Sequence, residues 1–330
     1  MEESIIRIGV LGGASIAEKY MIPAIQQMPE KFKLVGVASR TRVNASRFAD
    51  KFNTKGITGY LKMIDLEDID AVYIPLPNVL HYEWVKKALE SGLHVLVEKS
   101  LACSYSEVDE LSRLARSYNL ALIENFQFRF HSQLQEIRSI LNSGIMGELR
   151  CIRSSFGFPP FRDEDNIRYS KKLGGGALLD AGAYTLKASQ LFLGLDCRIT
   201  AASCFMDKEK GVDIWGGGFV QDNSSDLFSE IAFGFDQHYQ CSIDLWGSKG
   251  KLSTNRIFTA PPGYEPILKI ENQNGIKELT LEPDHHFCKM LNHFYEQCLK
   301  GGSEEEAQLN LNQARLIKEF KTIANINEKK

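Results

Sequence analysis

The glycine-rich stretch 5–17 contains small residues at a spacing that suits the binding of a dinucleotide phosphate. Gly12, Ala14 and Ala17 fit the fingerprint G-x-G-x-x-G/A, with alanine at the second position as a departure from it. Such a turn lets the backbone approach a pyrophosphate, and free N–H groups of the following helix bind its charge. A plain strand–turn–helix without a ligand is the alternative. The predicted cofactor residues here are Gly12, Ala14, Ser15 and Ile16.

A serine and an arginine follow the second predicted strand, 32–39, where an NAD enzyme has an acidic residue for the ribose 2′-hydroxyl. Ser39 and Arg40 occupy this place. A carboxylate would repel a 2′-phosphate, whereas a guanidinium beside a hydroxyl donates charge-assisted hydrogen bonds to it. We therefore predict NADP(H) as the cofactor. Arg42 either assists or is a solvated residue of the next helix.

These cofactor residues need a doubly wound parallel sheet to position them. Apolar runs predict buried strands, and amphipathic segments between them predict helices. The predicted strands are 5–11, 32–39, 70–75, 94–98 and 120–125, and the predicted helices are 44–52, 80–91 and 104–117, the last with a Ser106/Asp109 capping pattern. Ligands of such sheets bind at the carboxyl ends of the strands. The cofactor residues predicted from this rule are Leu76, Pro77, Asn78, His81, Glu98 and Lys99, with a purely structural role as the alternative for His81.

The alternation of strand and helix stops near residue 125. Two-residue alternation in 228–235 and 238–245 predicts an antiparallel sheet. Further helices are expected at 177–192, 286–299 and 307–325, the first of them after the glycine run 174–176. A chain of 330 residues is long enough for two domains. We predict that they comprise residues 1–124 and 125–330.

Composition indicates an ordinary globular protein. Apolar residues make up 43% and the net charge is −3, without a basic block, so neither a nucleic-acid partner nor a membrane partner is expected. The acidic start of the chain lacks the features of a secretory signal, which predicts a cytoplasmic location. Seven scattered cysteines without a C-x-x-C pair are expected to be reduced thiols. The group His285–Cys288 is isolated, so no metal site is predicted.

Three motifs occur in a characteristic order: Gly-Val-Leu-Gly-Gly-Ala-Ser-Ile-Ala (9–17), Glu-Lys-Ser (98–100) and Gly-Gly-Gly-Ala-Leu-Leu-Asp-Ala-Gly-Ala-Tyr (174–184). Over nearly the whole chain, this order resembles the glucose–fructose oxidoreductase and inositol dehydrogenase family, Gfo/Idh/MocA. The resemblance implies an N-terminal Rossmann domain and a C-terminal substrate domain on an open, mostly antiparallel sheet. Because the exposed face of that sheet commonly pairs subunits in the family, a homodimer or homotetramer is expected.

The resemblance also implies roles for three residues. The family's Glu-Lys-Pro motif supplies a catalytic or substrate-anchoring lysine, here Lys99, although Ser100 replaces the proline. A helix after the glycine run supplies an aspartate and, four residues later, a histidine or tyrosine, here Asp180 and Tyr184. Reduction of a ketone needs a proton donor and positive charge near the developing alkoxide. Tyr184 and Lys99 are the predicted catalytic residues for these two tasks.

Four residues are predicted to bind the substrate: Asp180, Arg168, Asn125 and Arg129. Asp180 binds a sugar hydroxyl or caps the glycine loop. Arg168 binds a substrate phosphate or lies on the surface. Asn125 and Arg129 follow the last strand of the first domain and are expected to line the cleft between the domains.

Within the family, segments 166–169, 180–184 and 255–259 are most similar to sugar 3-ketoreductases that act on nucleotide-linked deoxysugars. The predicted function is therefore NADP-dependent hydride transfer to a sugar-ring carbonyl, with a sugar or nucleotide sugar as the small-molecule partner. One alternative is an NADP-dependent dehydrogenase of a free sugar or a trans-dihydrodiol. An alternative of another class is a dinucleotide-binding sensor without turnover, which the replacement of the motif's proline by Ser100 favours.

Overall fold

The computed structural model describes residues 4–163 and 166–326, which divide into two compact units. The first unit comprises the chain up to Gln127 together with Phe287–Leu311, and the second comprises Phe128–His286 together with the chain from Asn312 onward. The segment 287–311 thus belongs spatially to the first unit although it follows most of the second along the chain. The division into functional domains 1–124 and 125–330 stays a prediction.

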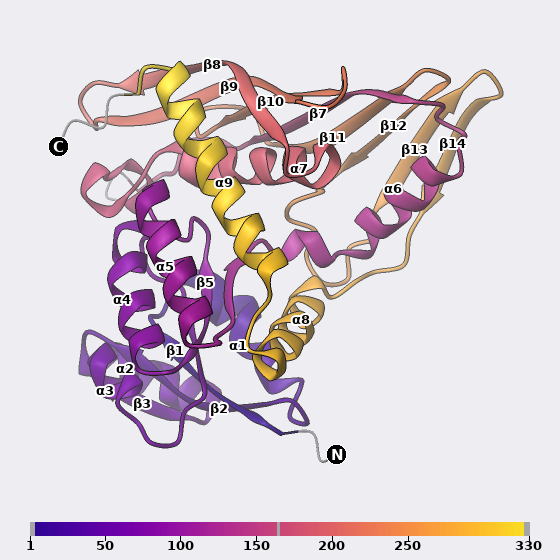
Figure 1. Cartoon of the computed structure of the whole chain (residues 1–330). Helices are drawn as coiled ribbons and strands as arrows, with labels where there is room; N and C mark the ends of the chain where they lie inside the picture. Colours follow the sequence, from indigo (N-terminus) through magenta and orange to yellow (C-terminus); the bar gives the residue numbers. More distant parts are fainter. Residues whose placement is uncertain (1–3, 164–165, 327–330) are drawn as a thin grey trace. The chain divides into compact units, whose positions relative to one another are not determined.

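The first unit is built on a six-stranded parallel sheet with the order β3-β2-β1-β4-β5-β6. Figure 1 labels β1, β2, β3 and β5 of this sheet. The chain order reverses between β1 and β4, the point at which open sheets of this kind bind ligands. The strands are β1 (Ile6–Leu11), β2 (Phe32–Ser39), β3 (Lys55–Thr58), β4 (Ala71–Ile74), β5 (His94–Glu98) and β6 (Leu122–Asn125). The helices are a π turn (Ala17–Met21) that continues into α1 (Ile22–Gln26), then α2 (Arg42–Phe52), α3 (Tyr60–Ile64), α4 (Asn78–Glu90), α5 (Tyr105–Ser117) and α8 (His286–Lys300).

The second unit is built on an eight-stranded sheet with the order β14-β13-β12-β11-β7-β10-β9-β8 (Figure 1). All neighbouring strands are antiparallel except β7 and β10, which are parallel. The strands are β7 (Leu149–Gly157), β8 (Cys197–Asp207), β9 (Val212–Asp222), β10 (Phe228–Gly234), β11 (Gln240–Gly247), β12 (Gly250–Asn255), β13 (Ile267–Asn272) and β14 (Gly275–Thr280). The helical segments are four short turns (Gln127–Phe130, Ile167–Tyr169, Lys171–Leu173 and the π turn Leu178–Gly182), α6 (Ser132–Asn142), α7 (Ala183–Leu193) and α9 (Glu304–Ile323), which begins in the first unit.

The two faces of the second sheet differ. Helix α7 packs on β7, β9 and β10, and its residues from Ala183 to Gln190 are all buried. Large apolar side chains also remain exposed on the strands of this sheet, namely Phe205, Trp215, Phe219 and Trp246. Phe205 and Trp215 stack with ring centroids 3.9 Å apart. Exposed aromatic side chains on neighbouring strands are typical of a surface that another molecule covers.

The fold class predicted from the sequence is confirmed, with local corrections. All the predicted strands and helices are present. In the first unit β3 and α3 were not predicted, and in the second unit α6 and the strands β7, β8, β9, β12, β13 and β14 were not assigned ranges. The predicted Ser106/Asp109 capping pair is wrong, because Ser104 and Glu107 form the capping box of α5. Helix α9 begins at Glu304 rather than at residue 307.

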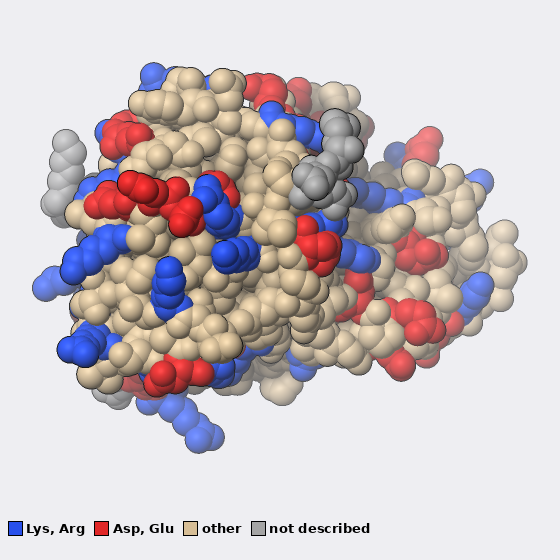
Figure 2. Space-filling view, turned by 90° about the horizontal axis from the view of Figure 1, so that it is seen from below, with Lys and Arg blue, Asp and Glu red and all other residues tan. Residues whose placement is uncertain are grey.

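Charge, cysteines and membrane-crossing potential complete the description. Basic and acidic side chains are interspersed on the face of the molecule shown in Figure 2. None of the described cysteines is joined in a disulfide. Among the helices in the described part of the chain, none combines the length and apolar character that crossing a bilayer requires.

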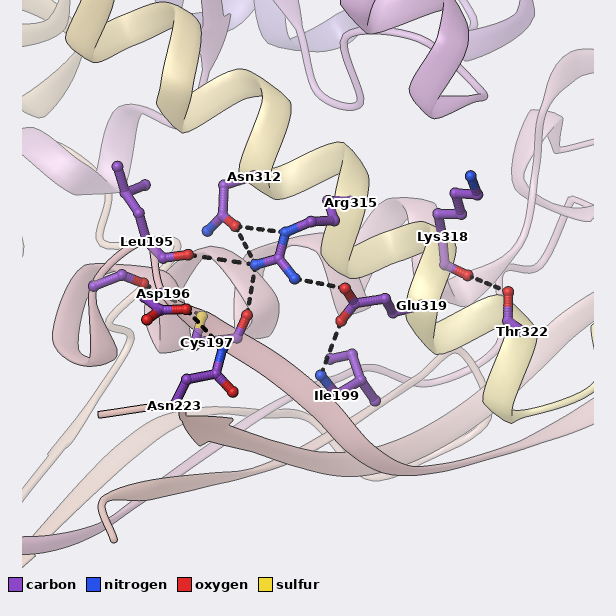
Figure 3. Close-up of polar contacts among 11 residues, drawn as sticks. Leu195, Asp196, Cys197, Ile199, Asn223, Asn312, Arg315, Lys318, Glu319 and Thr322 are labelled. Carbon is purple, nitrogen blue, oxygen red and sulfur yellow. Dashed lines mark hydrogen bonds and ion pairs between the residues drawn. The ribbon is translucent and has the colours of Figure 1, made fainter. Parts of the chain in front are cut away.

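Arg315 fixes the C-terminal half of α9 to the start of β8 (Figure 3). Its guanidinium donates to the carbonyl oxygens of Cys197 (2.5 Å) and Leu195 (3.3 Å) and to Glu319 Oε1 (2.5 Å). The other carboxylate oxygen of Glu319 accepts the backbone N–H of Ile199 at 3.1 Å. Ile199 lies where the pairing of β8 with β9 shifts register. The arginine and the glutamate therefore bind backbone groups at the irregular start of β8.

Replacement of Arg315 tests this attachment. Arg315→Met removes donors from two backbone carbonyls and should lower the free energy of unfolding by about 1–2 kcal/mol, as measured by urea denaturation. Arg198→Met, at an exposed position of β8, is the control and should change stability little. Equal stability of the two variants would contradict a structural role for the Arg315 contacts.

Candidate functional site

The glycine turn lies at the carboxyl end of β1 and packs tightly against the loop after β4. Gly12 has a φ of +120°, which L side chains rarely adopt, and its N–H donates to Ala38 O at 2.9 Å. A Cβ atom there would lie 2.8 Å from Leu76 Cδ2. The structure therefore brings two of the predicted cofactor residues, Gly12 and Leu76, side by side, and only glycine fits this position.

The helix that follows the turn presents its N-terminus at the same edge of the sheet. Ala14 O accepts the N–H of Glu18 at 3.1 Å, so the helix begins at this point, with Ser15 exposed and Ile16 partly exposed in its first turn. Ala17, the third small residue of the fingerprint, is completely buried. N–H groups at the start of a helix bind phosphate, and a small residue at the third position lets the helix pack closely on the strand.

Ser39 and Arg40 end the neighbouring strand β2 at this same edge. Ser39 is 8% exposed and its carbonyl accepts the N–H of Gly59, whereas Arg40 is exposed. Burial raises the pKa of the Tyr60 hydroxyl, and the neighbouring Arg40 guanidinium opposes that rise. Arg42 is the exposed first residue of α2. The structure thus leaves Arg40 accessible at the edge where the glycine turn lies.

Glu98 holds together the carboxyl ends of three neighbouring strands. Its Oε1 accepts hydrogen bonds from Tyr73 Oη on β4 (2.6 Å) and from Asn125 Nδ2 on β6 (2.7 Å). Burial raises the pKa of Glu98, and these two hydrogen bonds oppose the rise. Asn125 is completely buried in the first unit. The structure thus shows a hydrogen bond between the side chains of Glu98 and Asn125. The predicted contacts of Glu98 with the cofactor and of Asn125 with the substrate stay predictions.

The loop that carries Lys99 is held by buried side chains after the lysine as well. The ring nitrogens of His81 lie 2.7 Å from the carbonyl oxygens of Ser100 and Leu76, and the ring is completely buried. Glu124 Oε1 accepts the N–H of Leu101 at 2.9 Å. The peptide bond between Lys99 and Ser100 is cis. Lys99 itself is partly exposed. Its side chain therefore projects from a loop that hydrogen bonds hold before and after it.

His81 therefore links the loop after β4 to the loop after β5. Burial lowers the pKa of His81 to about 4, against the effect of the two carbonyl groups. A neutral imidazole has a single N–H, so in that form the ring donates to only one of the two carbonyl oxygens at a time. Of the two roles weighed for His81, these contacts support the structural one.

Tyr184 lies in α7 of the second unit within an aromatic cluster. It is 7% exposed, and its ring centroid lies 5.3 Å from that of Phe156, 5.7 Å from that of Phe258 and 5.8 Å from that of Phe128. Phe258 belongs to the motif 255–259 that the sequence comparison singled out. The phenol ring is therefore fixed in direction by packing on three sides.

Asp180 and Arg168 form an ion pair, and Asp180 lies about one helical turn before Tyr184. Arg168 Nε donates to Asp180 Oδ2 at 2.5 Å, and the side chains are 36% and 15% exposed. The charge of Asp180 raises the pKa of Arg168, with a smaller contribution from Tyr184. Asp180 and Tyr184, four positions apart, therefore both influence the same guanidinium.

The glycine loop is capped by a residue that the sequence analysis missed. Asp213 Oδ2, on β9, accepts the N–H of Leu178 at 2.5 Å, so capping, one of the two roles weighed for Asp180, belongs to Asp213. Burial raises the pKa of Asp213. A carboxylate within the apolar run Val-Asp-Ile is the sequence signal that could have revealed it. Glu124 in Leu-Ile-Glu-Asn gives the same signal.

Arg129 lies in the short turn Gln127–Phe130 and is partly exposed, with its guanidinium 5.2 Å from the centroid of the Phe130 ring. Its predicted contact with substrate stays a prediction. In the described part of the chain, no group of three or more His, Cys, Asp or Glu side chains is arranged to hold a metal ion.

A small cavity of about 30 Å³ in the first unit lies apart from these residues. It is lined by α5, β6 and the Gly301–Gly302 turn between α8 and α9. Three lining side chains, Ser112, Gln297 and Asn310, have buried oxygens without a hydrogen-bond partner. This volume holds one or two water molecules and no sugar. The cavity is therefore too small to be the substrate site.

The parallel sheet, the glycine turn at its switch point and the exposed Arg40 define a dinucleotide-binding protein of the Rossmann class. Comparison with family models extends this class. Residues 6–126 match the oxidoreductase family with an NAD-binding Rossmann fold, and residues 134–253 match the GFO/IDH/MocA C-terminal domain.

Comparison with individual proteins agrees with the match to these family models. The chain is 40% identical, over 88% of its length and 86% of the relative's, to a dTDP-3,4-didehydro-2,6-dideoxy-alpha-D-glucose 3-reductase of Saccharopolyspora spinosa. It is 31% identical, over 87% of both chains, to a D-xylose 1-dehydrogenase (NADP(+)) of Haloferax volcanii. The structure of KijD10, a 3-ketoreductase from Actinomadura kijaniata in complex with NADP and TDP-benzene, matches with a TM-score of 0.93 and 35% identity, covering 97% of this chain and 98% of that one. The chain belongs to the Gfo/Idh/MocA family of oxidoreductases.

The contacts around His81 all lie within the first unit, and a substitution in the full chain tests them. His81→Leu leaves the carbonyl groups of Leu76 and Ser100 without the imidazole and should lower the free energy of unfolding by about 1–3 kcal/mol. Amide hydrogen exchange in residues 98–102, measured by mass spectrometry, should become faster. His238→Leu, at an exposed position, is the control. Unchanged exchange in residues 98–102 would show that His81 does not hold the Lys99 loop.

Proposed function

We propose that this protein is an NADP-dependent oxidoreductase that reduces the 3-keto group of a nucleotide-linked deoxysugar. The observation that carries the proposal is Tyr184, a buried phenol about one helical turn after Asp180 of the Arg168–Asp180 ion pair, in a chain that aligns over nearly its full length with 3-ketoreductases. Solved forms of KijD10 include variants in which one lysine or one tyrosine is replaced. These are the residue types that we assign to catalysis.

The first unit fits the cofactor. Gly12 gives the turn after β1 a φ of +120°, and the helix N-terminus that follows at Ser15 and Ile16 would supply N–H groups for the pyrophosphate. Ser39 and Arg40 would hold the 2′-phosphate. The remaining contacts would come from Ala14, Leu76, Pro77, Asn78, Glu98 and Lys99. When bound, NADPH supplies the hydride.

The chain's own residues supply the rest of the reaction. The Tyr184 hydroxyl donates its proton to the carbonyl oxygen of the substrate, and the Lys99 ammonium stabilises the negative charge that develops there. Asp180 accepts a hydrogen bond from a ring hydroxyl and so orients the sugar. Asn125 and Arg129 complete the proposed substrate contacts, although Asn125 is bonded to Glu98 in the structure.

Two alternatives remain distinct from this proposal. An NADP-dependent dehydrogenase of a free sugar is favoured by the similarity of this chain to the xylose dehydrogenase. A dihydrodiol dehydrogenase is favoured by its similarity to the trans-1,2-dihydrobenzene-1,2-diol dehydrogenase of Xenopus tropicalis, to which it is 31% identical over 62% of each chain. A sensor without turnover is favoured by Ser100 at the motif's proline position. Substrate screening with NADPH and NADP separates the three.

We further propose that the protein is cytoplasmic and forms a homodimer or homotetramer through the second sheet. The support for assembly is the set of exposed aromatic side chains on β8, β9 and β11, Phe205, Trp215, Phe219 and Trp246. A second copy of the same surface would bury them, since two-fold interfaces are self-complementary.

Replacement of the phenol tests the reaction. Tyr184→Phe keeps the ring in its aromatic cluster but removes the proton, so kcat with NADPH and a 3-keto nucleotide sugar should fall about 10²- to 10⁴-fold. The affinity for NADPH, measured by fluorescence titration, should stay the same. Tyr118→Phe, at an exposed position of the first unit, is the control. Full turnover of Tyr184→Phe would refute the proton-donor assignment.

Replacement of Arg40 tests the cofactor preference. Loss of charge-assisted hydrogen bonds to the 2′-phosphate should weaken NADPH binding roughly 10- to 100-fold in Arg40→Ala and leave NADH binding unchanged. Arg42→Ala decides between the two roles of Arg42, since a solvated arginine would leave both affinities as they are. Equal affinities of the unaltered protein for NADPH and NADH would refute the preference.

A further inference from the structure

The short turn that carries Arg168, residues 166–170, packs directly on the glycine run 174–176. Gly176 N–H donates to Arg168 O at 2.9 Å, and Gly175 N–H donates to Ser170 O at 3.0 Å. A Cβ atom on Gly175 would lie 2.4 Å from Arg168 O, a distance that real Cβ atoms do not show. The backbone of the Arg168 turn can occupy this place only because the run has no side chains there.

Further contacts fix both the backbone and the guanidinium of Arg168. Asn166 Oδ1 accepts the N–H of Arg168 at 3.1 Å, which shapes the turn. The guanidinium lies 4.8 Å from the centroid of the Phe161 ring, and its Nε donates to Asp180 at 2.5 Å. Stacking and an ion pair together leave a guanidinium few orientations.

We infer that Arg168 is a positioning residue for the proposed reduction, acting through Asp180: it holds the Asp180 carboxylate beside Tyr184, and the glycine run serves to bring the Arg168 turn to that place. The inference rests on the proposed function. The carboxylate held in this way orients the sugar hydroxyl that it binds, and the sugar carbonyl is thereby aligned with the phenol. This role differs from the substrate-phosphate contact predicted from the sequence, since the guanidinium is already bonded to Asp180.

A double-mutant cycle separates the two roles. We compare Arg168→Met, Asp180→Asn and the double variant with the unaltered protein, using NADPH and a 3-keto nucleotide sugar. If Arg168 acts through Asp180, Arg168→Met should lower kcat about 10- to 100-fold with little change in KM, and the double variant should be no slower than Asp180→Asn. Losses that multiply, or a rise in KM alone, would overturn the inference in favour of a phosphate contact.

Three further variants exclude a purely structural effect. Arg168→Lys keeps a positive charge and should recover part of the lost kcat. Gly175→Ala leaves every charged residue in place but displaces the Arg168 turn, so it should lower kcat as Arg168→Met does. Lys172→Met, at an exposed position near the same run, is the control and should have unaltered kinetics. An unchanged circular dichroism spectrum shows that each variant is folded, and full activity of folded Gly175→Ala would contradict the role of the glycine run.

Failure of the inference is distinguishable from failure of the proposed function. If Tyr184→Phe is slow but the cycle is additive, only the inference is wrong. If the unaltered protein reduces no keto sugar, the proposed function is wrong, and the coupling is measured in the same four proteins by thermal unfolding. The shifts in melting temperature should then be non-additive, and additive shifts would show that Arg168 and Asp180 are not coupled.

Discussion

The backbone of a loop that ends in a functional side chain must have its own polar groups satisfied, and in this protein buried polar side chains do so. His81 and Glu124 bind the backbone after Lys99, and Asp213 binds the first helical N–H after the glycine run. Each of these side chains is buried, where an unmade hydrogen bond costs more free energy than in water. The loops are consequently held in one conformation, which a catalytic side chain at their ends requires.

A second constraint, close packing of the backbone, explains the two glycine turns. At Gly12 and at Gly175 a side chain would collide with a neighbouring segment, Leu76 in one case and the Arg168 turn in the other. In both places two chain segments approach more closely than any side chain allows. The absence of a side chain on each glycine therefore allows the neighbouring segment to pack against it. These segments carry Leu76, a proposed cofactor contact, and Arg168.

Local signals in the sequence were sufficient for five of the six strands of the parallel sheet and for most of the helices, whereas in the second sheet they gave ranges only for β10 and β11. Apolar runs of β-branched residues predicted β1 and β2 almost to the residue, because burial on both faces leaves little choice of residue. Strand β3 has only four residues, one of them glycine, and gives no such signal. The capping pair of α5 was misplaced because Ser104/Glu107 and Ser106/Asp109 both have a hydroxyl residue three positions before a carboxylate, and only the structure shows which serine precedes the helix.

Contacts between distant parts of the chain were beyond such signals. The hydrogen bonds of His81 to Ser100 and of Asp213 to Leu178 depend on sheet order and register, which residue patterns do not specify. Asp180 was proposed as a substrate contact from the resemblance and Arg168 from the chemistry of its guanidinium. Their ion pair follows from the packing of the Arg168 turn on the glycine run. The types of residue were therefore predictable, and their partners were not.

The return of residues 287–311 to the first unit has a consequence for biosynthesis. Phe32 stacks against Phe294 and meets the edge of Tyr295, both from α8. During translation, β2 leaves the ribosome long before α8 has been synthesised. The apolar surface around Phe32 in the nascent Rossmann sheet therefore stays exposed until almost the whole polypeptide has been made. Folding of the first unit is therefore completed only after release or near it, and a gene fragment that stops at Gln127 encodes a unit with an uncovered aromatic surface.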